Sequence, residues 1–166
     1  MQKIGVLGAG TMGAGIAQAF AMAGKDVVLR DISEALVDKC IAGIQANLDR
    51  FVSRNQLAAE EADAAKHRLT GAVDIAAFAD CDLIVEAIVE VMEVKKTVFA
   101  ELDEAVQPEA ILVSNTSSLS ITEIASATSR PDKVLGMHFF NPAPVMKLVE
   151  VIRGIATSQE TVDRVL

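Results

Sequence analysis

The sequence predicts an α/β domain built on a doubly wound, mostly parallel sheet. Short apolar strands alternate with amphipathic helices along most of the chain, a glycine-rich turn links the first strand to the first helix, and two prolines near the C-terminus stop the alternation. Strands that alternate with helices form parallel sheets with right-handed crossovers. A chain of 166 residues is long enough for one such domain, and we expect residues 1–166 to form it.

The first half of the chain predicts a strand, a helix, a second strand and a helical arm. Apolar runs of strand length and apolar residues at helical spacing place the first four elements at Lys3–Leu7, Met12–Ala23, Asp26–Arg30 and from Ser33 to about Ser53. Gly24 follows the first helix, and Ser33 is a residue type that caps the next one. Ala58–Lys66 is rich in alanine and charge, which suits a core helix or a solvated arm, and we expect an insertion here.

The second half predicts further alternation and then a returning strand. The predicted strands are Leu69–Val73, Leu83–Glu86, Ile111–Asn115 and Val134–His138, and the predicted helices are Val91–Ala105 and Ile121–Ala127. Asn141–Pro144 must turn the chain because its two prolines cannot continue a central strand, so Lys147–Ile152 returns antiparallel. Ser158 caps a last helix, and we expect the chain to stop inside it with Val162, Val165 and Leu166 uncovered.

Composition excludes several classes of function. The net charge of −8 opposes binding to nucleic acid, and no apolar run reaches the length of about 18 residues that a membrane span requires. Cys40 and Cys81 lie in no CxxC motif and have no nearby histidine, so we expect neither a disulfide framework nor a metal site. The first apolar stretch is too short and glycine-rich for a signal peptide, so we expect a cytoplasmic protein.

The segment Gly8–Gly13 matches the pattern G-x-G-x-x-G directly between a strand and a helix. In this context the glycines permit a tight turn, close approach of a pyrophosphate and packing of helix on strand, as in Rossmann folds. The pyrophosphate then binds N–H groups at the positive end of the helix. The alternative is an ordinary turn that needs glycine for packing alone. The residues predicted to bind the cofactor here are Gly8, Gly10, Thr11, Met12 and Gly13.

Asp31 ends the second predicted strand, where an acidic residue binds the adenosine ribose in dinucleotide-binding folds. Its carboxylate accepts hydrogen bonds from ribose hydroxyls and repels a 2′-phosphate, so the sequence favours NAD over NADP as cofactor. The neighbouring Arg30 weakens that preference. The alternative is that Asp31 only caps the following segment.

His138 and Glu150 form a second candidate site. If their two strands pair antiparallel about Pro144, the two residues face each other and can hydrogen-bond. A carboxylate fixes the tautomer of a histidine, leaves its other ring nitrogen free as a base, and stabilises the imidazolium. Oxidation of an alcohol by a nicotinamide cofactor needs such a base. The alternative is a histidine that is only satisfied within the core.

Four stretches carry a family resemblance. They are GAGTMG at 8–13, EAIVE at 86–90, NTSSL at 115–119 and HFFNPAPVMKLVEV at 138–151. In this order and spacing they resemble the 3-hydroxyacyl-CoA dehydrogenases, and among them the bacterial 3-hydroxybutyryl-CoA dehydrogenases. The resemblance extends over essentially the whole chain. It implies an NAD-dependent enzyme that interconverts (S)-3-hydroxyacyl-CoA and 3-ketoacyl-CoA, with short-chain substrates.

The resemblance also implies catalytic roles for individual positions. His138 is similar to the catalytic base of the family and Glu150 to the carboxylate that orients it. Ser117 is similar to the serine near the 3-oxygen of the substrate and near the nicotinamide. The alternative for Ser117 is a helix N-cap beside Asn115 and Thr116.

Further positions are implied on the cofactor and substrate sides. Glu90 and Lys95 resemble the family's charged pair near the nicotinamide, and Asn141 resembles its companion in the active site. The alternative for Glu90 and Lys95 is a solvated pair at a helix N-terminus. The family's arm helps to bind the CoA nucleotide. Asn47, Arg50 and Arg54 lie in that region, but the match is loose and no role is assigned to any one of them.

The family continues into a helical C-terminal domain that forms a homodimer interface and closes the substrate cleft, and we expect this chain to lack it. The leading alternative is therefore an isolated NAD-binding module without activity. A structural role is also known for a lens crystallin that resembles the family, because fold does not dictate function. Retention of Asp31 and His138 argues against that role, and the HFFNP and NTSSL stretches argue against other hydroxyacid or imine reductases.

Overall fold

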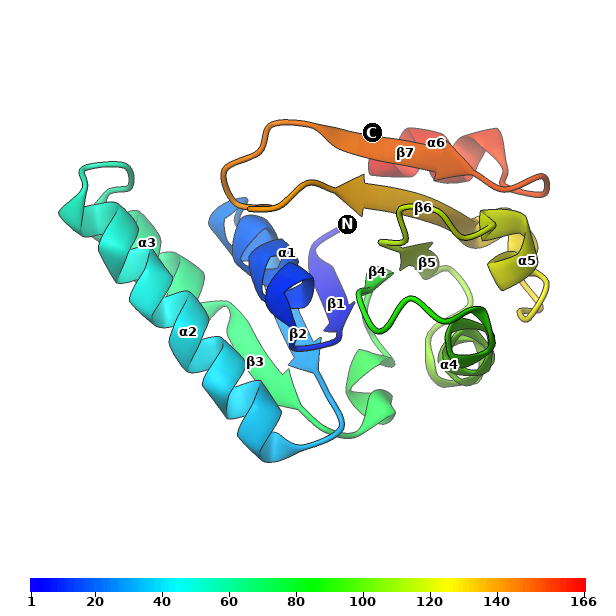
Figure 1. The fold of residues 1–166 in the computed structure, drawn as a ribbon, viewed down its shortest axis with the longest axis horizontal. Helices are drawn as coiled ribbons and strands as arrows, with labels where there is room; N and C mark the ends of the chain where they lie inside the picture. Colours follow the sequence, from blue (N-terminus) through cyan, green and yellow to red (C-terminus); the bar gives the residue numbers. More distant parts are fainter.

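The computed structural model describes all residues, Met1–Leu166, and has a single seven-stranded sheet in the order β3-β2-β1-β4-β5-β6-β7 (Figure 1). The strands are β1 Lys3–Leu7, β2 Asp26–Arg30, β3 Leu69–Ala72, β4 Leu83–Glu86, β5 Ile111–Ser114, β6 Val134–Phe139 and β7 Val149–Arg153. The first six strands are parallel and β7 is antiparallel to β6. The predicted doubly wound α/β fold with a returning strand is confirmed.

Helices cover both faces of the sheet. They are α1 Thr11–Met22, α2 Glu34–Ser53, α3 Ala59–His67, α4 Met92–Ala105, α5 Ile121–Ala125 and α6 Gln159–Val165, with short 3₁₀ turns at Ile75–Phe78 and Pro131–Lys133. The helices α1, α2 and α3 pack together on one face, and α4 packs with α5 on the other (Figure 1). No helix combines the length and apolar character needed to cross a membrane.

Alternate residues along the strands point into two separate hydrophobic cores, one on each face of the sheet. Val27, Leu29 and Val85 belong to the cluster under α1–α3, whereas Val28 and Ile84 belong to the cluster under α4 and α5. This is the period-two pattern of strands that are buried on both sides, as parallel sheets are. The sheet is packed between these two cores, which fix the positions of the carboxyl ends of its strands.

The strand order reverses between β1 and β4, which are neighbours in the sheet. In open α/β sheets, ligands bind in the crevice outside the carboxyl ends of the strands at this point of reversal. The glycine turn after β1 and the segment after β4 both leave the sheet here. The topology therefore places one cleft at the ends of β1 and β4.

Several sequence predictions differ from the structure at their boundaries. The returning strand is Val149–Arg153 instead of Lys147–Ile152, because residues 147 and 148 lie before the β6–β7 ladder begins. The helix predicted to reach Ala127 ends at Ala125. The 3₁₀ turn at Ile75–Phe78, which Asp74 begins by accepting a hydrogen bond from Ala76 N–H, was not predicted.

The two short helices α3 and α6 are more deeply packed than the sequence predicts. Ala62 and Ala65 of α3 are buried in the cluster under α1–α3, so this segment is a core element as well as part of the arm. Val162 of α6 is buried and Val165 is half-buried against the same cluster, so the prediction that both stay uncovered is wrong. Small side chains allow close helix packing that a count of charges does not reveal.

Candidate dinucleotide-binding and catalytic site

The turn at Gly8–Gly13 has a backbone that only glycine permits at two of its positions. Gly8 has φ +110°, and a Cβ there would lie 2.6 Å from the carbonyl oxygen of Ala87. A Cβ on Gly13 would lie 1.7 Å from the carbonyl oxygen of Gly8, which no side chain can occupy. These two glycines therefore serve the fold of the turn itself.

Gly10 differs from its two neighbours because a Cβ there would meet no protein atom within 4 Å. It is the N-cap of α1 and has no side-chain partner, and the first intrahelical bond is the one from Ala14 N–H to its carbonyl. The N–H groups of the first helical turn are thus free, as at any uncapped helix start. Open space in front of free N–H groups fits an anionic pyrophosphate.

Asp31 holds this turn in place. Its Oδ2 accepts a hydrogen bond from Ala9 N–H at 2.6 Å, and its Oδ1 accepts one from Ile32 N–H at 2.6 Å. Gly8 N–H donates to the Arg30 carbonyl at 2.8 Å, which ties the turn to the end of β2. Arg30 Nε donates to the Val73 carbonyl at 2.8 Å, and Arg30 lines the same cavity as Asp31. The carboxylate keeps acceptor capacity for ribose hydroxyls beyond its two backbone bonds.

His138 and Glu150 occupy directly opposed positions on β6 and β7. Their side chains meet through His138 Nδ1 and Glu150 Oε2 at 2.8 Å, with 23% and 52% of the two side chains exposed. Nδ1–H donates to the carboxylate in this arrangement, which leaves Nε2 as the free acceptor nitrogen. The ring of Phe140 packs on the imidazole with 4.7 Å between the ring centres.

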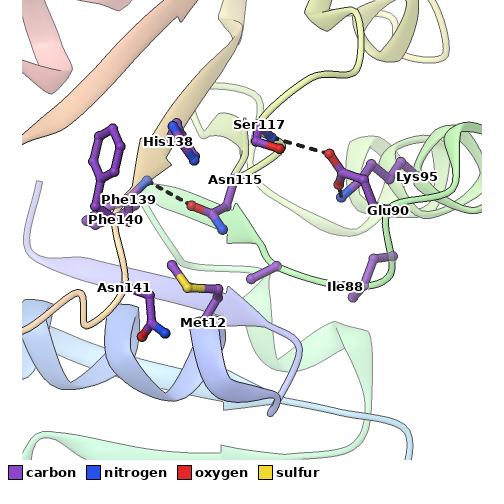
Figure 2. A pocket seen from close by; sticks show the side chains of 11 residues that line it. Met12, Ile88, Glu90, Lys95, Asn115, Ser117, His138, Phe139, Phe140 and Asn141 are labelled. Carbon is purple, nitrogen blue, oxygen red and sulfur yellow. Dashed lines mark hydrogen bonds and ion pairs between the residues drawn. The ribbon is translucent and has the colours of Figure 1, made fainter.

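A cavity of about 370 Å³ lies beside His138 at the carboxyl ends of the strands (Figure 2). The predicted residues Met12, Glu90, Lys95, Ser117, His138 and Asn141 all line it. A second cavity of about 670 Å³ is lined by the glycine turn, Asp31 and apolar side chains that include Ile32 and Val94. The two cavities share Met12, Ala87 and Ile88 in their walls, so they form one cleft over the glycine turn. A dinucleotide needs such a cleft with two compartments.

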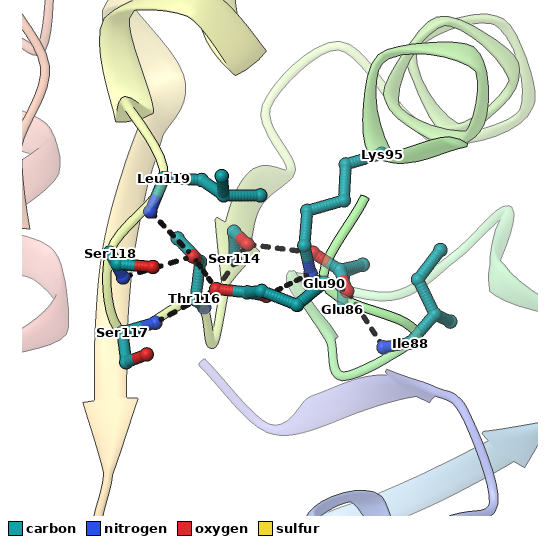
Figure 3. A network of polar contacts seen from close by, with 9 residues as sticks. All are labelled: Glu86, Ile88, Glu90, Lys95, Ser114, Thr116, Ser117, Ser118 and Leu119. Carbon is teal, nitrogen blue, oxygen red and sulfur yellow. Dashed lines mark hydrogen bonds and ion pairs between the residues drawn. The ribbon is translucent and has the colours of Figure 1, made fainter. Parts of the chain in front are cut away.

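A buried polar network lies behind the cavity that His138 lines, which is the candidate catalytic cavity (Figure 3). Lys95 is only 1% exposed and its Nζ lies 2.6 Å from Oε1 of Glu86, whose side chain is 0% exposed. Glu86 also accepts hydrogen bonds from Ile88 N–H at 2.7 Å and from the Ser114 hydroxyl at 2.7 Å. The alternative of a solvated pair is therefore wrong for Lys95, which is buried against a partner on β4.

Glu90 forms the outer part of the same network. Its Oε2 lies 3.2 Å from Lys95 Nζ, and its Oε1 accepts hydrogen bonds from the Thr116 hydroxyl and from Ser117 N–H. Partial burial raises the pKa of Glu90, but the Thr116 hydrogen bond and the Lys95 charge outweigh it and hold the pKa below its usual 4.5. Glu90 is thus a carboxylate at neutral pH.

The Asn115–Leu119 loop is shaped by Thr116 instead of Ser117. The Thr116 hydroxyl accepts hydrogen bonds from Ser118 N–H and Leu119 N–H within the loop. The helix N-cap that the alternative gave to Ser117 is Ser120, whose side chain accepts from Glu123 N–H at the start of α5. Ser117 lies at the cavity with its side chain exposed. Asn115 Oδ1 accepts from Phe139 N–H at 2.9 Å and so joins the loop to β6 beside His138 (Figure 2).

Sequence reasoning missed four residues of the site. Glu86, Thr116, Asn115 and Phe140 stood inside the quoted motifs but received no role of their own. A glutamate that closes an apolar strand is the one signal that could have revealed Glu86, because a buried acid requires a partner. The other three depend on contacts between loops, which spacing does not encode.

The turn, the cleft and the topology together define an NAD-type dinucleotide-binding domain with the strand order of the Rossmann fold. The sequence profile of the family described as "3-hydroxyacyl-CoA dehydrogenase, NAD binding domain" matches residues 3–166. The chain belongs to this family, and NAD is accordingly its cofactor.

Individual relatives agree with this assignment. The chain is 51% identical to 3-hydroxybutyryl-CoA dehydrogenase of Clostridioides difficile over 98% of its own length and 58% of that protein. It is 49% identical to 3-hydroxyadipyl-CoA dehydrogenase of Escherichia coli K12, covering 99% of this chain and 34% of that protein. A crystal structure of 3-hydroxybutyryl-CoA dehydrogenase from Escherichia coli K12 superposes with a TM-score of 0.96 at 49% identity, covering 98% of this chain and 34% of that one. The chain thus spans one third to three fifths of these relatives.

Proposed function

We propose that residues 1–166 are the NAD-binding domain of an enzyme that interconverts (S)-3-hydroxyacyl-CoA and 3-ketoacyl-CoA, with 3-hydroxybutyryl-CoA and acetoacetyl-CoA as the substrate class. The observation that carries the proposal is the His138–Glu150 pair, which leaves Nε2 of His138 beside the cavity that adjoins the glycine turn. A base placed next to a nicotinamide compartment is the arrangement that alcohol oxidation requires.

The chain's own residues supply the proton chemistry. His138 accepts the proton of the 3-hydroxyl at Nε2, and in the reverse direction it returns that proton to the oxygen of the forming alcohol. Glu150 accepts the Nδ1–H hydrogen bond throughout and stabilises the imidazolium. Bound NAD supplies the hydride acceptor. Ser117 and Asn141 line the same cavity, and we assign them to orient the substrate oxygen and the nicotinamide amide.

The residues that would hold NAD are those of the turn and the larger cavity. Gly8, Gly10, Thr11 and Met12 line the larger cavity at the open start of α1, where we place the pyrophosphate, and Gly13 acts behind them by packing against the Gly8 carbonyl. Asp31 faces the same cavity and would bind the adenosine ribose. Neither cysteine lines the cavity beside His138 or the larger cavity, and burial raises the pKa of Cys40 and of Cys81 to about 11, so neither serves as a thiolate nucleophile.

A third cavity suggests the course of the acyl-CoA. It has a volume of about 310 Å³, lies between α1, α2 and the Asn141–Pro144 turn, and shares Asn141 with the catalytic cavity. Arg50 lines it and provides a cation for a phosphate, and Asn47 donates to Gln18 at 2.7 Å in its wall. We propose that the pantetheine and nucleotide of CoA run from Asn141 toward Arg50. Arg54 lies outside this lining.

A direct test uses acetoacetyl-CoA and NADH. The enzyme that contains this domain should oxidise NADH with acetoacetyl-CoA, and its His138→Ala variant should lower kcat at least about 1,000-fold while the Kd for NADH stays within a factor of about two. Circular dichroism verifies that the variant folds. Near-normal turnover by folded His138→Ala would rule out the proposed base.

A second candidate is a nucleotide-binding module without turnover on its own. It is favoured by the coverage of the relatives, because the chain spans only 58% of one and 34% of the other. The two candidates separate in one experiment on the 166-residue chain. Fluorescence titration should show NADH binding in both cases, whereas turnover of acetoacetyl-CoA by this chain alone would exclude the inactive module.

The proposal extends to the setting of the enzyme. We propose a cytoplasmic enzyme, in agreement with two cysteines that are free and buried. We also propose that a helical C-terminal domain completes the cleft and makes the homodimer contact, as the family resemblance implies. Size-exclusion chromatography of the chain with and without such a domain tests the second statement, because only the longer protein should elute as a dimer.

A further inference from the structure

Three charged side chains meet behind the catalytic cavity, and their charges do not cancel. Glu86, Glu90 and Lys95 form one connected cluster with two negative charges and one positive charge (Figure 3). One negative charge is therefore left over. Its location depends on which carboxylate pairs with the ammonium.

The geometry assigns the ammonium to Glu86. Lys95 Nζ lies 2.6 Å from Glu86 Oε1 but 3.2 Å from Glu90 Oε2. Glu86 is fully buried, and its remaining partners, Ile88 N–H and the Ser114 hydroxyl, are neutral. A buried carboxylate without a cation is far more costly than a half-exposed one, so Glu86 retains the pair.

Glu90 consequently carries the remaining charge, and it faces the cavity. Its side chain is 41% exposed and lines the catalytic cavity, whereas Glu86 does not (Figure 2). Apart from Lys95, its partners are the neutral Thr116 hydroxyl and Ser117 N–H. Lys96, the next cation along α4, lies 3.9 Å from Glu93 and from Glu123, so it is engaged outside this cluster.

The consequence rests on the proposed function. Because the hydride leaves the carbon whose hydroxyl proton goes to His138, the nicotinamide ring must share the cavity of His138 and Glu90. That ring is a cation in NAD⁺ and neutral in NADH. We propose that Glu90 is a specificity-determining residue that favours the oxidised cofactor. Glu86 is then a positioning residue, because it prevents Lys95 from cancelling the Glu90 charge.

The expected effect is measurable. A unit charge about 6 Å from a cationic ring, at an effective dielectric constant of about 40, changes the affinity for the cation about tenfold and leaves a neutral ring nearly unaffected. The ratio of the Kd for NAD⁺ to the Kd for NADH should therefore follow the net charge of the cluster. A change in packing alone would weaken the binding of NAD⁺ and of NADH by the same factor, so it would leave this ratio unchanged.

The experiment measures both Kd values by calorimetry on the 166-residue chain and three variants. Glu90→Gln and Glu86→Gln each bring the cluster to zero net charge, so each should raise the ratio about tenfold. The double variant Glu86→Gln/Lys95→Met restores one negative charge, so its ratio should return to the wild-type value. Glu93→Gln, an exposed carboxylate on the same helix, should leave the ratio unchanged. ADP-ribose, which has no nicotinamide, should bind all variants alike.

The outcomes separate this inference from the function on which it rests. If NAD⁺ and NADH bind but Glu90→Gln changes the ratio by less than a factor of about two, the charge assignment is wrong. The inference also fails if the ratio in the double variant differs from the wild-type ratio by more than a factor of about two. This comparison can be made even if Glu86→Gln alone does not fold. If the wild-type chain binds neither nucleotide, the proposed cofactor site fails and the inference fails with it.

Discussion

His138 and Glu150 are the only titratable pair in the structure that joins β6 to β7, and they sit at directly opposed positions of that antiparallel ladder with 2.8 Å between Nδ1 and Oε2. The pairing is set by backbone register, so neither side chain depends on a mobile loop for its place. The sheet therefore fixes where the two residues lie, and the Glu150 carboxylate and the Phe140 ring orient the imidazole.

Glu150→Gln should slow catalysis without disturbing cofactor binding. The amide can still accept the Nδ1–H bond and keep the tautomer, but it cannot stabilise the imidazolium. We expect kcat for NADH oxidation with acetoacetyl-CoA to fall about 100-fold, with the KM for NADH within a factor of about two. Glu160→Gln, an exposed carboxylate on α6, is the matched control. A kcat for Glu150→Gln close to that of this control would contradict the assigned role.

Gly10→Ala should weaken NADH binding, whereas Gly13→Ala should destabilise the fold. A methyl group on Gly10 meets only open space, so the melting temperature should stay within about 2 °C while the Kd for NADH rises at least about tenfold. A methyl group on Gly13 collides with the Gly8 carbonyl, so the free energy of unfolding should fall by about 2 kcal/mol or more. Thermal and urea unfolding with NADH titration test both. Loss of stability in Gly10→Ala with an unchanged Kd for NADH would show that Gly10 serves the fold of the turn instead of cofactor binding.

Asp31→Ala should weaken NADH binding through two losses. The variant removes the acceptor that holds Ala9 N–H and the carboxylate that is proposed to bind the ribose. We expect the Kd for NADH to rise about tenfold or more, and the preference for NADH over NADPH to shrink. Asp38→Ala removes an exposed carboxylate from α2 and should have no effect on either Kd. If Asp31→Ala and Asp38→Ala raised the Kd for NADH equally, the effect would come from the net charge of the protein and not from the position of Asp31.

Asp103 should make stability depend on pH in the acid range. Desolvation raises its pKa, but hydrogen bonds from Ser129 and the Arg130 guanidinium outweigh it and hold the pKa below the usual 3.8. A depressed folded pKa means that the stabilisation is complete well above 3.8 and is lost as the pH falls through the folded pKa.

The test compares urea unfolding of wild type and Asp103→Asn across this range. The difference in free energy of unfolding should be largest near pH 7 and should shrink below about pH 4. Asp132→Asn, whose carboxylate is exposed, is the control. A difference that stays constant from neutral to acid pH would show that Asp103 acts through packing alone.

Much of the fold could be predicted because its signals are local. Strands buried on both faces appear as short apolar runs, and the glycine turn is recognisable from its place between a strand and a helix. The His138–Glu150 pairing was predicted on the condition that the two strands pair about Pro144, and the observed register meets that condition. Family resemblance supplied the proposed roles of Ser117, Glu90 and Asn141, which spacing could not give, and the structure places all three in the lining of one cavity.

The rest could not be predicted because it depends on contacts between distant segments. The burial of Lys95 requires Glu86 from a strand and Ser114 from the next strand, which only the sheet order brings together. The covered side of α3 depends on two alanines whose small size matters only against α1 and α2. The 3₁₀ turn at Ile75–Phe78 is too short to give a helical period.

The exposed stretch Val145–Leu148 joins β6 to β7 but takes no part in their ladder. Mutation can therefore lengthen, shorten or rewrite this connection while His138 and Glu150 remain at opposed positions of the ladder. A single residue inserted inside either strand would instead turn one partner to the other side of the sheet. Insertions and deletions confined to the hairpin tip therefore leave the ladder that opposes His138 and Glu150 unchanged.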